Sequence, residues 1–108
     1  MLFTLNGTDA LNLAIRGLAM PKLLRGERVR VVATDLEHNS VIRPFRTLES
    51  LGAEVVFVPL DPHTGAADPN HFAEALGPET TLCAAIHGSN VIGAVQPLTE
   101  FGAAAKAN

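Results

Sequence analysis

The residues of this chain that could do chemistry gather in three short polar clusters, NGTD at 6–9, EHNS at 37–40 and HGSN at 87–90. In the first, Gly7 lets a ligand approach the backbone closely. Thr8 offers a hydroxyl at the positive end of a helix dipole, an arrangement suited to phosphate. The chain has neither a GxxxxGK[ST] nor a GxGxxG motif. A bound phosphate would therefore be the single phosphate of a cofactor rather than a nucleotide's chain.

The second and third clusters supply groups that could contact the rest of such a ligand. His38 has a flat ring that can stack on another ring or move a proton. The side-chain amide of Asn90 can donate to a ring hydroxyl or a carboxylate. Each cluster taken alone is equally typical of capping and turn residues. What favours a binding site is their common position relative to the predicted strands.

Short apolar runs alternate with helical patterns along the chain. The apolar runs predict four strands, at 1–5, 28–34, 53–59 and 80–87. Helical spacing and end signals predict four helices. The first begins at Asp9 and the second stops near Gly52. The third runs from Pro69, after an Asp68 cap, to Gly77, and the fourth begins at Pro97. The first helix shows its apolar stripe at positions i, i+3, i+4 and i+7: Leu11, Ala14, Ile15 and Leu18.

Four alternations of strand and helix predict an α/β fold, a mainly parallel sheet covered by helices in three layers. In such sheets ligands bind where the loops leave the carboxyl ends of the strands. All three polar clusters follow a predicted strand. We therefore expect them to meet at one rim of the sheet and form a site.

Composition excludes several classes of partner. The chain has 108 residues, about one domain, and a net charge of only −3 with scattered Lys and Arg, so we expect no nucleic acid partner. A single cysteine, Cys83, excludes an internal disulfide or a thiolate zinc cluster and suits the reducing cytoplasm. No segment approaches the ~20 apolar residues that a bilayer requires, so we expect no membrane span.

Four segments, in order along the chain, resemble motifs of the class V pyridoxal-phosphate enzymes, the family of class V aminotransferases and cysteine desulfurases. They are FTLNGTDALNLAI, EHNSVIRP, LGAEVVFVPLD…G…DP and SNVIGAVQPL. By this resemblance Thr8 would bind the cofactor phosphate with help from the amides of Gly7 and Asp9. His38 would stack on the pyridine ring, and Asn90 would lie beside the ring or the substrate carboxylate.

The resemblance also implies an architecture. Residues 1–108 would be one partial domain, the N-terminal portion of the large domain of a fold-type I pyridoxal-phosphate transferase. In that fold the second, third and fourth predicted strands lie together, with the third at an edge and the first far away. We therefore expect strand 1–5 either to pair with strand 80–87 or to leave an edge through which the chain forms a homo-oligomer.

The match is incomplete for catalysis. The chain ends at Asn108, before the segments in which the family carries the aspartate that pairs with the pyridine nitrogen and the Ser-x-His-Lys lysine that holds the cofactor. Lys22 and Lys106 match neither motif, and Cys83 lies in an apolar run, where it is typical of a core residue. We expect the chain to be inactive alone and to belong to an enzyme of an amino-acid substrate. The alternative is a stand-alone, non-catalytic α/β module that binds a small anion or a partner chain.

Overall fold

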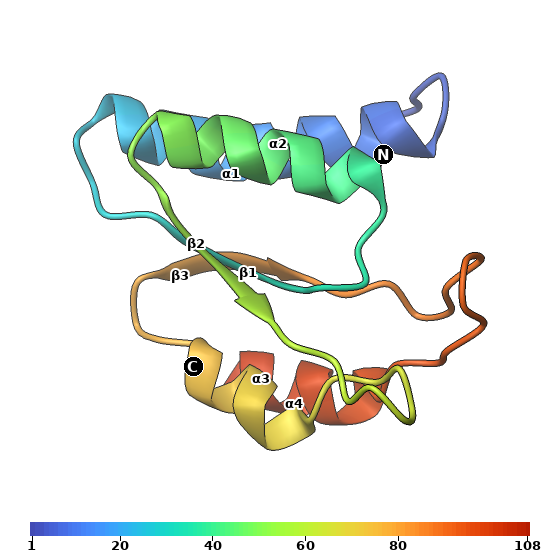
Figure 1. The fold of residues 1–108 in the computed structure, drawn as a ribbon. Coiled ribbons are helices and arrows are strands. Elements are labelled where there is room, and N and C mark those ends of the chain that lie inside the picture. The colour runs from blue at the N-terminus through green and yellow to red at the C-terminus, as the bar shows by residue number, and fades with distance from the viewer.

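The computed structural model describes all residues, 1–108, as a three-layer α/β arrangement (Figure 1). Its elements, in chain order, are α1 (Gly7–Leu24), β1 (Arg30–Thr34), α2 (Asn39–Ser50), β2 (Glu54–Val58), α3 (Pro69–Ala75), β3 (Thr80–Ala84) and α4 (Leu98–Ala107). α1 and α2 cover one face of the sheet, and α3 and α4 cover the other. The predicted fold class is confirmed. No helix is long and apolar enough to cross a membrane.

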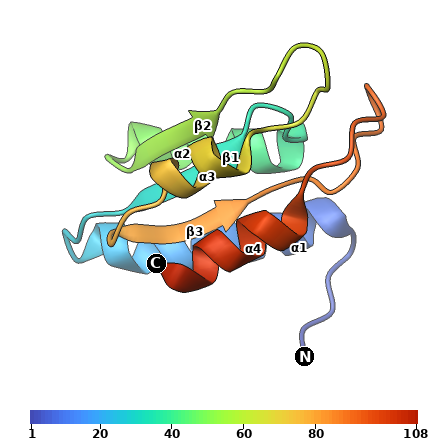
Figure 2. The same cartoon turned by 90° about the horizontal axis from the view of Figure 1, so that it is seen from below.

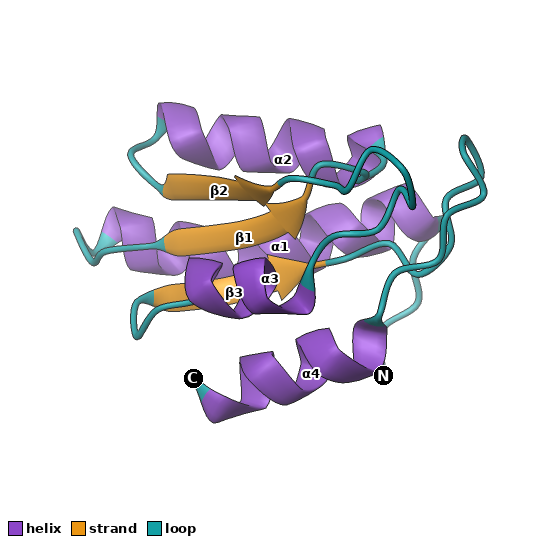
Figure 3. Ribbon diagram, turned by 60° about the horizontal axis from the view of Figure 1, so that its bottom comes forward, coloured by secondary structure: helices purple, strands orange, loops and turns teal.

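The sheet has three strands in the order β2-β1-β3, and both pairings are parallel (Figure 3). Val31 lies opposite Val55 on one side and Leu82 on the other, so β1 is hydrogen-bonded along both edges. The prediction that these three strands lie together, with the strand predicted at 53–59 at an edge of the sheet, is confirmed. Because parallel strands end at the same rim, the loops after β1 and β3 leave the sheet side by side.

Alternate residues of the strands enter two separate hydrophobic cores. Val31 and Ala33 face α1 and α2, in a core that contains the buried Phe45. Val32 faces the other side, in a core that contains Phe72 and is closed by α3 and α4. With both faces covered, the sheet holds the ends of β1 and β3 in fixed relative positions.

The prediction of a strand at 1–5 is wrong. These residues have no regular structure, and they are exposed and extend away from the body of the molecule (Figure 2). A parallel strand needs a hydrogen-bonded neighbour and a cover on each face, and the free edge of β3 does not take up this segment. The sheet accordingly has three strands rather than four, and the expected pairing of 1–5 with 80–87 does not form.

The first helix is correctly predicted, but of its predicted apolar stripe only Ile15 is buried. α1 begins at Gly7, and its buried residues are Ile15 and Ala19. Leu11 and Leu18, which belong to the predicted stripe, are 38% and 56% exposed. The sheet reaches only part of the apolar surface of α1, because no strand lies beyond β3.

The remaining boundaries shift by a few residues. The strand predicted to reach residue 87 ends at Ala84, and the helix predicted to reach Gly77 ends at Ala75. The predicted cap of α3 is confirmed, since the Asp68 carboxylate accepts a hydrogen bond of 2.7 Å from the amide of Asn70. The early end of β3 matters for the site, because it lengthens the loop that carries Asn90.

Candidate functional site

Two of the three polar clusters meet at the rim where β1 and β3 end. The segments that follow these strands enclose a hollow of about 260 Å³. It is lined by Asp35, Leu36, Glu37, His38, Asn39, Ile86, Ser89, Asn90 and Val91. The structure therefore brings together His38 and Asn90, which are far apart in the sequence.

His38 is held at the start of α2, where it is the N-cap residue. Its Nδ1 accepts a hydrogen bond of 3.2 Å from the amide of Ser40 and lies 2.9 Å from the Ser40 hydroxyl oxygen. A ring nitrogen that accepts from a backbone amide carries no proton, so the proton of the neutral imidazole is on Nε2. The side chain is otherwise exposed. The cap fixes one ring edge and leaves the ring available at the hollow.

Asn90 lies on a loop that is braced from within. The buried Ser89 accepts at its hydroxyl oxygen from the amides of Val91 and Ile92, at 3.2 and 3.3 Å. The backbone of Ser89 also pairs with Ala94. These bonds give the loop a defined shape without a strand or helix, and the Asn90 side chain is left exposed at the hollow.

Glu37 is a residue of this site that sequence reasoning included in the polar cluster but gave no role. It is only 8% exposed, although it is a carboxylate. Its Oε1 accepts from the Thr34 hydroxyl at 2.8 Å and from the amide of Ile86 at 2.7 Å. A Glu three residues after the end of a buried strand is the signal that could have marked it, because carboxylates are almost never buried without partners.

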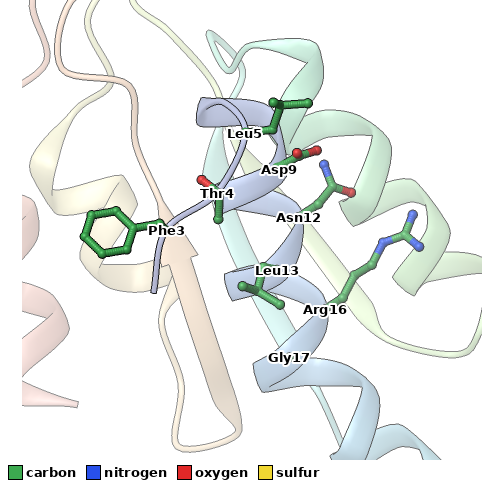
Figure 4. Close-up of a pocket in the computed structure, with 8 residues that line it drawn as sticks. All are labelled: Phe3, Thr4, Leu5, Asp9, Asn12, Leu13, Arg16 and Gly17. Atoms are coloured by element: carbon green, nitrogen blue, oxygen red, sulfur yellow. The ribbon is translucent and has the colours of Figure 1, made fainter. Parts of the chain in front are cut away.

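The first cluster is placed at the same end of the molecule but outside this hollow. α1 begins where β1 and β3 end (Figure 1), yet Gly7, Thr8 and Asp9 line no part of the hollow at His38. Asp9 instead lines a second hollow of about 730 Å³, formed by the N-terminal segment against α1 (Figure 4). The expected meeting of all three clusters in one site is thus only partly confirmed.

The start of α1 has free polar groups nonetheless. Its cap is Asn6, whose side-chain oxygen accepts from the amide of Asp9 at 2.9 Å, so one of the two amides that the prediction assigned to phosphate is engaged. The amides of Gly7 and Thr8 and the Thr8 hydroxyl make no hydrogen bond. A Cβ built on Gly7 would meet nothing within 4 Å, so the protein itself does not require glycine there.

The cysteine and the other three histidines of the chain do not line this hollow. Cys83 packs against the core beneath α3 and α4, and burial raises the pKa of its thiol, which favours the protonated form. His87 is exposed and contributes its carbonyl, which accepts from the amide of Gln96. His63 and His71 are exposed on the opposite helical layer and its loop. No group of three or more His, Cys, Asp or Glu residues is arranged to hold a metal.

Both lysines lie at the other end of the sheet. Lys22 is in the last turn of α1 and contacts the Thr81 hydroxyl at 3.5 Å, near the start of β3. Lys106 is in the last turn of α4 (Figure 3). Neither lines the hollow that contains His38 and Asn90.

Comparison with known proteins defines the class to which this fold and rim belong. The structure superposes with a TM-score of 0.87 on the crystal structure of DndA from Streptomyces lividans, at 31% identity, over 99% of this chain and 29% of that one. It superposes with a TM-score of 0.82 on SspA in complex with cysteine, also at 31% identity, over 93% of this chain and 28% of that one. These neighbours share the α/β architecture of fold-type I pyridoxal-phosphate enzymes.

The sequence comparison is more specific. Residues 1–108 match the family model described as aminotransferase class-V. The cysteine desulfurase IscS of Dictyoglomus turgidum is 34% identical over 106 residues, which cover 98% of this chain and 26% of that protein. The chain belongs to the class V aminotransferase family, whose members depend on pyridoxal phosphate, and it spans about a quarter of the length of the curated relatives it matches.

Proposed function

We propose that this chain supplies one wall of the pyridoxal-phosphate site of a class V aminotransferase or cysteine desulfurase-like enzyme. The observation that carries the proposal is the convergence of His38 and Asn90, from loops after two adjacent parallel strands, on one hollow. Pyridoxal phosphate, when bound, supplies an electron sink for bonds at the α-carbon of an amino acid. Cysteine is the substrate suggested by the name of the desulfurase relative.

The polar groups at this rim fit such a cofactor. The His38 ring, fixed by its cap to Ser40, offers a flat face for stacking on the pyridine ring. The Asn90 amide can hydrogen-bond a ring hydroxyl or the substrate carboxylate. At the start of α1, the unpaired amides of Gly7 and Thr8 and the Thr8 hydroxyl offer three donors to a phosphate, with the engaged Asp9 adding only the helix dipole.

Neither lysine of this chain lines the hollow. The remaining catalytic groups would therefore come from segments that the longer relatives have in addition to the part that this chain matches. The activity of the whole enzyme as a transferase, desulfurase or lyase would belong to a protein of that length. The single cysteine supports a reducing compartment such as the cytoplasm.

Removing the Thr8 hydroxyl tests the phosphate end of this proposal. Thr8→Ala is expected to weaken pyridoxal-phosphate binding by about 1 kcal/mol, roughly fivefold, because a hydrogen bond to a charged group is lost. Equilibrium dialysis of the purified chain measures the affinity. Thr99→Ala, at an exposed position in the first turn of α4, is the matched control. Because Asn6 rather than Thr8 caps α1, a weaker affinity would not reflect a lost cap.

The same assay separates the cofactor site from a simple anion site. His38→Asn keeps a capping side chain for α2 but removes the ring. This variant should lose affinity for pyridoxal phosphate and keep its affinity for inorganic phosphate. If His38→Asn kept its affinity for both ligands and Thr8→Ala also bound as tightly as the wild type, the proposed site would be contradicted. That result would favour the stand-alone binding module.

The outer face of α1 supports a second part of the proposal, a homo-oligomer. Leu13 and Leu18 are 52% and 56% exposed and line an apolar hollow of about 460 Å³ with residues of the N-terminal segment. The neighbouring strand β3 has a free edge. A free parallel edge beside exposed leucines can pair symmetrically with a second copy of itself, which satisfies backbone groups and buries both faces at once.

We expect sedimentation equilibrium at micromolar concentration to show a dimer or larger assembly, with roughly 1,000 Å² or more buried if the interface is specific. Leu18→Glu should shift the chain toward monomer, because it places a charge in the face that the proposed interface would bury. Leu51→Glu, at a residue that is 51% exposed at the end of α2, should not. A wild-type chain that stays monomeric would contradict the proposed homo-oligomer.

A further inference from the structure

Glu37 joins the ends of two strands through a single oxygen. Its donors come from two neighbouring strands: Thr34 is the last residue of β1, and Ile86 follows β3. Thr34 is completely buried and Glu37 nearly so. The bonded oxygen is thus shielded from water on the side where the two strands separate. Glu37 also immediately precedes His38 in the chain.

The backbone cannot make this connection. The last pair between β1 and β3 is Ala33 with Ala84, so the ladder stops before Ile86. Beyond that pair the two chain segments diverge toward α2 and toward the loop of Asn90. The amide of Ile86 has no backbone acceptor, and the Glu37 carboxylate takes it instead. A carboxylate is well suited to this, because one oxygen can accept two hydrogen bonds.

The far end of the Asn90 loop is held by a different group. Gln96 is 2% exposed, and its side chain donates to the carbonyl of Gly65 and accepts from the amide of Ala67, both at the opposite helical layer. Gln96 therefore anchors the loop away from His38. Among the side chains of the rim, Glu37 alone ties the loop to the segment that carries His38.

We propose that Glu37 is a positioning residue, which sets the distance between His38 and Asn90 by fixing Ile86 to the end of β1. The identity of the ligand that His38 and Asn90 would bind rests on the function proposed above. The tether itself rests only on the hydrogen bonds of Glu37. It acts before any ligand arrives and makes the hollow preformed rather than induced.

Three variants test the tether by amide hydrogen exchange, followed residue by residue by NMR. Glu37→Ala should speed exchange at Ile86 on the order of tenfold or more, because the only acceptor of that amide is removed. Exchange at Val32, in the centre of the sheet, should change far less. Glu37→Gln keeps an oxygen that can accept both bonds, so it should restore protection at Ile86. Glu49→Ala, at the exposed carboxylate paired with Arg46 on α2, is the control.

Pyridoxal-phosphate affinity is the second readout. It should fall in Glu37→Ala and return in Glu37→Gln, in parallel with protection at Ile86. Unchanged protection at Ile86 in Glu37→Ala would overturn the proposal. So would a Gln variant that protects Ile86 yet binds the cofactor as poorly as the Ala variant, since the carboxylate would then contact the ligand itself.

Two provisions keep the test decisive. If Glu37→Ala does not fold, Thr34→Val removes the hydroxyl that orients the carboxylate and should speed exchange at Ile86 more than at Val32; equal effects would overturn the tether. If the wild-type chain binds no pyridoxal phosphate, the proposed function fails for this chain, whereas exchange at Ile86 still decides the role of Glu37.

Discussion

Phe45→Ala is expected to destabilise the chain by about 3–5 kcal/mol, a large part of the 5–15 kcal/mol that small domains typically possess. Phe45 is completely buried in the core between the sheet and the helices α1 and α2. Its ring centroid lies 6.3 Å from that of Phe57 on β2. Truncation leaves a cavity that two helices and a strand surround, and such a site relaxes only partly.

Urea unfolding followed by circular dichroism measures the effect as a lower midpoint. Leu51→Ala is the control, because that leucine is half exposed and should change stability by no more than about 0.5 kcal/mol. Similar midpoints for the two variants would mean that the first core does not hold the layers together as the structure indicates.

Reduction with borohydride in the presence of pyridoxal phosphate is expected to label neither lysine of this chain selectively. Lys22 and Lys106 lie in the last turns of α1 and α4, at the opposite end of the sheet from His38. The effect is all-or-none, because a site-directed lysine is labelled stoichiometrically whereas a surface lysine reacts only in proportion to reagent. The expected pattern is weak labelling of the two lysines and of the N-terminal amine, with no amine labelled stoichiometrically.

Peptide mapping after reduction distinguishes these results. Lys22→Arg and Lys106→Arg keep the charge of each position and serve as matched controls, and neither should alter pyridoxal-phosphate affinity. One stoichiometric adduct on a single lysine would contradict the prediction and would place that lysine at the cofactor.

The layers follow from local patterns in the sequence, whereas the strand order is implied by the family resemblance. Apolar runs such as 28–34 and caps such as Asp68 report on nearest neighbours, and these elements form where predicted. Residues 1–5 carry the same apolar signal as the true strands and form none. Strand formation needs a partner, and the pattern of a segment does not reveal whether a partner edge is within reach.

Some features of the candidate site could likewise be predicted from the sequence, and others could not. His38 and Asn90 could be predicted because their clusters follow strands, and the carboxyl ends of parallel strands converge by geometry. The roles of Glu37 and Gln96 could not, because each depends on a hydrogen bond from an amide brought near only by the fold. The structure places His38 and Asn90 at one hollow, and Gly7, Thr8 and Asp9 at the same end but outside it. The roles of all five residues toward a cofactor stay predictions.

The central position of β1 also bears on the order in which the sheet assembles. Val31 pairs with Val55 across one connection and with Leu82 across a connection roughly twice as long, and each doubling of a loop costs about 0.6 kcal/mol in closure entropy. The β1–α2–β2 unit is therefore the less costly one to form first, and β3 docks onto an existing edge. His38 belongs to that first unit and Asn90 follows β3, so we expect the two walls of the hollow to meet only when β3 docks.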